Sequence, residues 1–248
     1  RQKWEQQQLE QFKAKGKMPK DDKWKEKYKE PEAYNGDGCK VPELWVMARA
    51  EQLCEFITKG TTPKKDKLCA GKGEIPFIKV YNITFDTSLN FSKDPTFTDR
   101  ETHEGFLARS KIFPGDVLMN IVGPPLGKVS IVPDTYDEWN INQAIAVYRP
   151  IRGFDSKLLA YFLLSKPIVE WMLSKTKTTA GQVNLTLEIS RNVPIPIMSM
   201  QEQSEVARLV EEKLISSDRL LEELNKQQIK AEKNKQSVLA SAFTGRII

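Results

Sequence analysis

Residues 199–245 read SMQEQSEVARLVEEKLISSDRLLEELNKQQIKAEKNKQSVLASAFTG. No proline or glycine interrupts this stretch before Gly245, and Ser199 followed by Glu202 has the pattern of a helix capping box. Gly245 stands where glycine commonly ends a helix. The stretch therefore predicts a single helix of about 44 residues, roughly 66 Å long at 1.5 Å per residue.

Along this helix a seam advances in alternating steps of four and three residues. It runs through positions 210, 214, 217, 221, 224, 228, 231, 235 and 238, occupied by Val, Leu, Ser, Leu, Leu, Gln, Ala, Lys and Val. A repeat of 3.5 residues is typical of a coiled coil, and the polar Gln228 and Lys235 weaken pairing while fixing its register. We expect the helix to pair with another helix, or with a second copy of itself, through its aliphatic side chains: Val210, Leu214, Leu221, Leu224 and Val238.

The pattern of apolar residues divides the chain into three parts, the last of which is the long helix. Residues 1–38 combine a short helical tail with a basic linker that contains prolines and glycines but no apolar period. Residues 39–198 alternate short apolar runs with turn residues, and residues 199–245 form the long helix. Strands are expected at 76–81, 116–122, 128–132 and 144–148, and helices at 45–57 and 156–174. Because strands and helices mix without a regular alternation, the fold class is α+β.

Charge is distributed unevenly over the 248 residues. Lys and Arg number 38 against 33 Asp and Glu, a net charge of +5. Residues 59–79 hold six basic against two acidic residues, whereas residues 80–165 hold eight against ten. A basic segment beside an acidic one suggests a surface that faces a polyanion, although a solvated lysine-rich loop has the same composition.

Several classes of protein do not fit the sequence. No apolar run approaches the roughly 20 residues of a membrane span, and the charged start is unlike a signal peptide, so we expect a cytoplasmic protein without membrane contact. The first residue is not Met, and we expect a piece of a longer chain.

The sequence also lacks the residue patterns of the enzyme classes that we considered. Three cysteines fifteen residues apart and a single histidine do not match a zinc site. The best nuclease constellation, Asp134 with Glu211 and Lys213, places two members on the long helix. We therefore expect no catalytic residue, no metal site and no cofactor bound by this chain.

Two basic, hydroxyl-rich loops, 58–65 and 175–184, are suited to DNA. Lysines, threonine hydroxyls and backbone N–H groups are common phosphate contacts, and Gln and Asn pair with adenine in the major groove. For Gln182 and Asn184, the spacing alone favours turn and cap bonding over contact with a base. The candidate DNA-binding residues are Lys59, Thr61, Thr62, Lys64, Lys65, Lys79, Tyr81, Asn82, Lys128, Lys175, Lys177, Thr178, Thr179, Gln182 and Asn184.

Several short motifs follow one another along the chain. They are Trp45, the turn at 58–63, Ile75-Pro76-Phe77-Ile78 with Asn82, Pro114-Gly115-Asp116-Val117-Leu118, Asn142-Gln143-Ala144, Gly181-Gln182-Val183-Asn184-Leu185, Val193-Pro194-Ile195-Pro196 with Glu202-Gln203, and Val238-Leu239 through Phe243, Gly245 and Arg246. In this order, they resemble the specificity subunit of type I restriction–modification systems.

The resemblance implies a non-catalytic reader of double-stranded DNA. In that family, two target-recognition domains alternate with two long helices that pair as an antiparallel coiled coil, and each domain reads half of a split site. The subunit holds methyltransferase and restriction subunits, which use S-adenosylmethionine, ATP and Mg. With one recognition domain and one long helix, this chain resembles the C-terminal half of such a subunit, or a natural half-subunit whose beginning is missing. A coiled-coil adaptor that binds protein, or the recognition region of a fused restriction–methylation enzyme, stays open as an alternative.

Overall fold

The computed structural model describes residues 41–176 and 183–244, together with residues 5, 6, 8, 9, 12, 18, 19, 21–28 and 34 near the N-terminus. The chain forms two compact units, Arg1–Cys39 and Lys40–Ile248. In the first unit, the 3-10 helix η1 (Asp22–Lys27) is capped by Asp21, whose side chain accepts a hydrogen bond from the backbone of Lys23. None of the helices in the described part of the chain combines the length and hydropathy that a membrane crossing requires.

The second unit contains two main sheets and two strand pairs among its described residues. The four-stranded sheet is antiparallel throughout, with the order β2 (Cys54–Lys59), β11 (Ile145–Pro150), β7 (Val117–Asn120) and β9 (Val129–Ile131). The five-stranded sheet has the order β3 (Leu68–Ala70), β5 (Thr96–Thr98), β4 (Ile75–Ile78), β10 (Trp139–Ile141) and β6 (Lys111–Ile112). Only β4 and β10 are parallel in it. The strand pairs are β1 (Val46–Arg49) with β13 (Pro194–Ile197) and β8 (Val122–Gly123) with β12 (Val183–Asn184).

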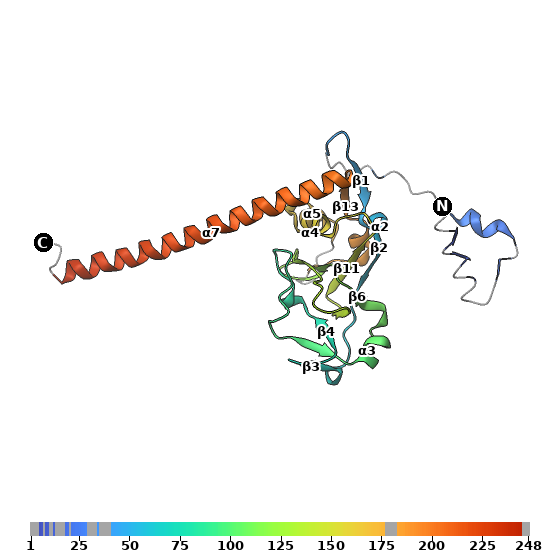
Figure 1. Ribbon diagram of the computed structural model, residues 1–248, viewed down its shortest axis with the longest axis horizontal. Helices are drawn as coiled ribbons and strands as arrows, with labels where there is room; N and C mark the ends of the chain where they lie inside the picture. The colour runs from blue at the N-terminus through green and yellow to red at the C-terminus, as the bar shows by residue number, and fades with distance from the viewer. Residues whose placement is uncertain are drawn as a thin grey trace. The chain divides into compact units, whose positions relative to one another are not determined.

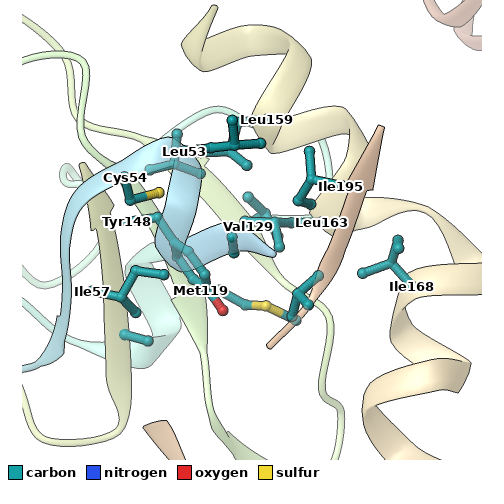
Figure 2. Close-up of a cluster of buried hydrophobic side chains, with 14 of the residues drawn as sticks. Leu53, Cys54, Ile57, Met119, Val129, Tyr148, Leu159, Leu163, Ile168 and Ile195 are labelled. Carbon is teal, nitrogen blue, oxygen red and sulfur yellow. The ribbon is translucent and has the colours of Figure 1, made fainter. Parts of the chain in front are cut away.

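Two apolar clusters bury both faces of the four-stranded sheet. Because side chains alternate along a strand, Val117 and Met119 of β7 join one cluster and Leu118 joins the other. The first cluster packs against α4 (Ser156–Leu164) and α5 (Lys166–Ser174), and its side chains meet between strands and helices in Figure 2. The second joins the sheet to Trp139 and Ile141 of the five-stranded sheet. Burial on both faces explains why β7 is apolar at consecutive positions.

The long helix α7 (Met200–Phe243) begins against this domain. Ser199 and Glu202 exchange the two hydrogen bonds of a capping box, 3.2 and 3.0 Å long. Gln203 is buried, and its Oε1 accepts a hydrogen bond from the backbone N–H of Asp155, directly before α4. Figure 1 shows α4 beside the first turns of α7. From residue 212 to residue 240 every side chain of α7 is exposed.

Short helices and 3-10 turns connect the strands. These are α2 (Ala50–Leu53), α3 (Arg100–Glu104), α6 (Leu187–Arg191), η3 (Lys65–Lys67), η4 (Val80–Asn82) and η5 (Ala108–Ser110).

The structure confirms the α+β class, the long helix and strands within 116–122, 128–132 and 144–148. The predicted strand at 76–81 is shorter, because β4 ends at Ile78 and η4 follows. Gly245, the predicted helix stop, lies outside the described residues, and Thr244 caps α7.

Both helices predicted inside the domain require correction. Residues 45–57 form β1, α2 and β2 instead of one helix, because the two strands pair with β13 and β11. Residues 156–174 form two helices, since the backbone is extended at Ser165 and Pro167, in the first turn of the next helix, has no N–H to continue the first.

Candidate nucleic-acid interface

Most of the candidate DNA-binding residues that the structure describes gather at one end of the four-stranded sheet. The last residue of β2 pairs with the second residue of β11, and the first residue of β11 pairs with the last residue of β7. The third residue of β7 pairs with the first residue of β9. The connections 60–65, 121–128 and 142–144 therefore all leave the sheet at the same end, which we call the loop end.

The first basic loop is clamped to the connection between β10 and β11. A methyl group at Gly60 would lie 2.2 Å from the carbonyl oxygen of Ile141, so only glycine permits this approach. The backbone N–H of Thr61 donates to the same carbonyl at 3.2 Å, and the Thr62 hydroxyl accepts from the backbone N–H of Gln143 at 3.4 Å. These contacts fix the backbone from which the lysines project.

Lys59, Lys64 and Lys65 are exposed, and no described carboxylate pairs with them. Some cations elsewhere in the domain are compensated, as Arg149 is by Asp116 through two hydrogen bonds of 2.6 and 2.8 Å. The three unpaired lysines make the field at this part of the loop end positive, which favours a polyanion.

Lys79 and Tyr81 extend this surface beside the loop end, since the carbonyl of Ile78 accepts a hydrogen bond from the backbone N–H of Asn142. The Lys79 ammonium lies 5.5 Å from the centroid of the Tyr81 ring. The Tyr81 hydroxyl donates to Asp94 at 2.6 Å.

Asn82 is not available to DNA, which corrects the sequence interpretation of this residue. Its side chain is 1% exposed. Its Oδ1 accepts from the backbone of Lys79 at 2.9 Å, and its Nδ2 donates to the carbonyls of Asn90 and Lys93 at 3.0 and 2.9 Å. Asn82 therefore holds the 79–93 loop together from inside.

The turn that carries Lys128 lies at the same end. Asn120 organises it, accepting from the backbone of Lys128 at 2.8 Å and donating to the carbonyl of Pro125 at 2.8 Å. The Lys128 ammonium lies 5.9 Å from the centroid of the exposed Phe85 ring. Asn184 is exposed and pairs with Val122 of β8, which brings the end of the second basic loop beside this turn.

Lys175 follows α5, with its ammonium 5.4 Å from the Trp171 ring centroid. The remaining candidates of the second loop lie outside the described residues: Lys177, Thr178, Thr179 and Gln182.

Two exposed residues at the loop end were not among the sequence candidates. The Arg109 Nε donates to the Thr61 hydroxyl at 3.0 Å. Gln143 is exposed, and its backbone bonds to Thr62. The sequence contains a pointer to Gln143, because this residue lies within the Asn142-Gln143-Ala144 motif. It contains no pointer to Arg109, since Arg109 is 48 residues from Thr61 in sequence.

The aliphatic seam of α7 divides into two parts. Val210 and Leu214 line an open groove of about 500 Å³ together with Phe85, Leu164 and Ile215. Further along, Leu221, Leu224 and Val238 are 59, 60 and 59% exposed. The described residues leave this part of the seam uncovered.

A polar cluster around His103 combines it with Glu104 and Glu138. His103 Nδ1 lies 2.9 Å from Asn140 Nδ2, and Asn140 is oriented by Ser110, whose hydroxyl donates to its Oδ1 at 2.8 Å. His103 Nδ1 must accept from Asn140, so the neutral ring carries its proton on Nε2, 3.6 Å from Glu138. The one lone pair that such a ring keeps, on Nδ1, is engaged by Asn140. Burial, followed by the charge of Lys111, lowers the pKa of His103 and keeps it neutral.

Comparison with known proteins gives a consistent result. The family model "Type I restriction modification DNA specificity domain" matches residues 42–231. The EcoBI specificity subunit of Escherichia coli is 30% identical over 140 residues, covering 56% of this chain and 29% of the relative. The putative MjaX specificity subunit of Methanocaldococcus jannaschii is 23% identical over 226 residues, covering 88% of this chain and 49% of the relative. This chain thus spans less than half the length of these relatives.

Solved structures share the fold. A chain from a structural study of complex assembly and conformational transition in the type I R-M system has a TM-score of 0.67 at 20% identity, over 84% of this chain and 48% of that one. The HsdS subunit from Thermoanaerobacter tengcongensis has a TM-score of 0.59 at 19% identity, over 81% and 49%. With the family model matching most of its length, the chain belongs to the family of type I restriction–modification DNA specificity domains.

Proposed function

We propose that this chain binds a specific sequence of double-stranded DNA through the loop end, and that it reads one half of a split target. The observation that carries the proposal is the gathering of unpaired cations and hydroxyl groups from separate loops at one end of the sheet. In such an interface lysines and threonines bind phosphates, and polar side chains between them contact base edges. Membership of the DNA specificity family supports the same function.

The chain works as part of a larger assembly in this proposal. The uncovered seam of α7 pairs with a second long helix, either in a complete specificity subunit or in another copy of this chain. Methyltransferase and restriction subunits bind the assembly and supply the chemistry with S-adenosylmethionine, ATP and Mg. The chain itself contributes recognition and scaffolding and no catalytic group.

The test is the salt dependence of binding to duplex DNA. Each phosphate neutralised contributes a slope of about −0.9 to the change of log K with log salt. Replacing Lys59, Lys64 and Lys65 by Ala should flatten the slope by up to ~3 units and weaken all sequences alike. The matched control replaces three exposed lysines of α7, Lys213, Lys226 and Lys230, by Ala and should leave the slope unchanged.

A second function, a coiled-coil adaptor whose domain binds protein, is favoured by the exposed seam of α7. An adaptor of this kind should not bind duplex DNA with an affinity that falls steeply as the salt concentration rises. Equal slopes for the wild-type chain and the triple variant at the loop end would contradict the DNA interface proposed for that loop.

A further inference from the structure

Arg109 has a fixed backbone position at the surface of the domain. It occupies η5 between Leu107 and Ser110, both fully buried. The Ser110 hydroxyl lies within hydrogen-bond distance of the Leu107 carbonyl at 3.1 Å and of Asn140 Oδ1 at 2.8 Å. Because both neighbours are anchored in the core, the direction in which the Arg109 side chain leaves the surface is set by the fold.

The Arg109 side chain is also held at one of its nitrogens. Its Nε donates to the Thr61 hydroxyl at 3.0 Å, and the backbone of Thr61 is itself bonded to Ile141. Within the described part of the chain, nothing binds its Nη1 or Nη2. Arg100 and Arg149 differ from Arg109 in this respect, since both bind carboxylates at 2.6 Å.

A planar guanidinium with two free terminal nitrogens matches the O6 and N7 acceptors of guanine. The neutral hydroxyl of Thr61 orients this fork without cancelling its charge. The flexible lysines of the same loop already offer charge for phosphates, a contact that needs no fixed geometry. An ordered fork loses less conformational entropy on binding, which favours a contact that depends on direction.

We propose that Arg109 reads a guanine in the major groove and that Thr61 is its positioning residue. The inference rests on the proposed function and adds to it a base and a side chain that specify sequence.

The experiment is selection of bound duplexes from a randomised pool by the full chain, followed by affinity measurements on the selected and on random DNA. The variants are Arg109→Ala, Arg109→Lys and Thr61→Val, each checked for folding by circular dichroism. Arg152→Ala is the control, because Arg152 is an exposed arginine that follows β11 at the opposite end of the sheet. Six strand residues at about 3.3 Å each separate the two ends by about 20 Å.

We expect the wild-type chain to select a motif with at least one guanine at which Arg109→Ala loses discrimination about 5- to 150-fold, the range of a bidentate contact. Arg109→Lys keeps the charge but not the fork and should lose discrimination at the same guanine. Thr61→Val should lose part of it there and nowhere else, which a general loss of stability would not produce. Arg152→Ala should select the wild-type motif.

An Arg109→Ala variant that selects the wild-type motif with equal discrimination would overturn the inference and leave DNA recognition standing. Equal weakening on selected and random DNA would also overturn it, because Arg109 would then contact phosphate. Unchanged discrimination in Thr61→Val would overturn the positioning role. If the wild-type chain selects no motif, the proposed function fails, and the inference fails with it.

Discussion

The uncovered seam of α7 predicts self-association of this chain. Leu214, Leu221, Leu224 and Val238 are 46, 59, 60 and 59% exposed. Full burial of such a side chain is worth about 1.5–3 kcal/mol, so covering the exposed part is worth roughly 1–2 kcal/mol each. Four side chains on each of two helices supply roughly 8–16 kcal/mol, against an association cost of about 4–15 kcal/mol. The seam should therefore support a dimer of modest affinity, further limited by Gln228 and Lys235.

Replacing Leu221 and Leu224 by Asp should abolish this dimer. The change removes two aliphatic side chains from each helix, a loss of about 4 kcal/mol or a thousandfold in affinity, and it adds like charges to the seam. Sedimentation at tens of micromolar should give a dimer for the wild-type chain and a monomer for the variant. The control Ser216→Asp with Gln236→Asp adds the same charge off the seam and should remain dimeric. If the wild-type chain also sediments as a monomer, self-pairing is wrong, and the seam is reserved for another subunit.

Three further predictions follow from individual side chains. If Gln182 or Asn184 contacts a base edge, its replacement by Ala should cost about 1–3 kcal/mol on the selected DNA and little on random DNA; equal losses would indicate a role in the turn. Asn82→Ala should lower the free energy of unfolding, measured in urea, by about 2–4 kcal/mol, because three buried hydrogen bonds are lost. A surface substitution changes this free energy by roughly 0.5 kcal/mol, and a change smaller than that would contradict the structural role of Asn82. Burial raises the pKa of Cys54 to about 12, so iodoacetamide at pH 8 should modify the exposed Cys69 and spare Cys54 unless denaturant is present, as peptide mass spectrometry can check.

The long helix could be predicted from the sequence because its determinants are local. Ser199 and Glu202 cap it, and no residue before its end breaks it. The strands were harder, because many of them span only two to four residues and take their conformation from partners far along the chain. Residues 45–57 illustrate this: their apolar spacing suits a helix, yet pairing of β1 with β13 and of β2 with β11 decides the outcome.

The candidate site divides in the same way. The basic loop at 59–65 is visible in the sequence because its lysines and threonines are adjacent. Arg109 is not, because only the fold brings it to Thr61. Asn82 shows the opposite error, since a polar residue after a strand can turn inward and satisfy backbone groups of its own loop. Composition identifies residues that are able to bind DNA, but burial decides which of them remain free to do so.

The central claim, that residues 39–198 read half of a split DNA target, is tested most directly by domain exchange. These residues replace the corresponding domain of the EcoBI specificity subunit, to which the chain is similar, in cells that carry the complete methylating system. Sequencing of methylated positions across the genome then gives the target of the hybrid. The account predicts a new sequence in one half of the target, with the other half retained. An unchanged target in cells where the hybrid assembles would contradict it.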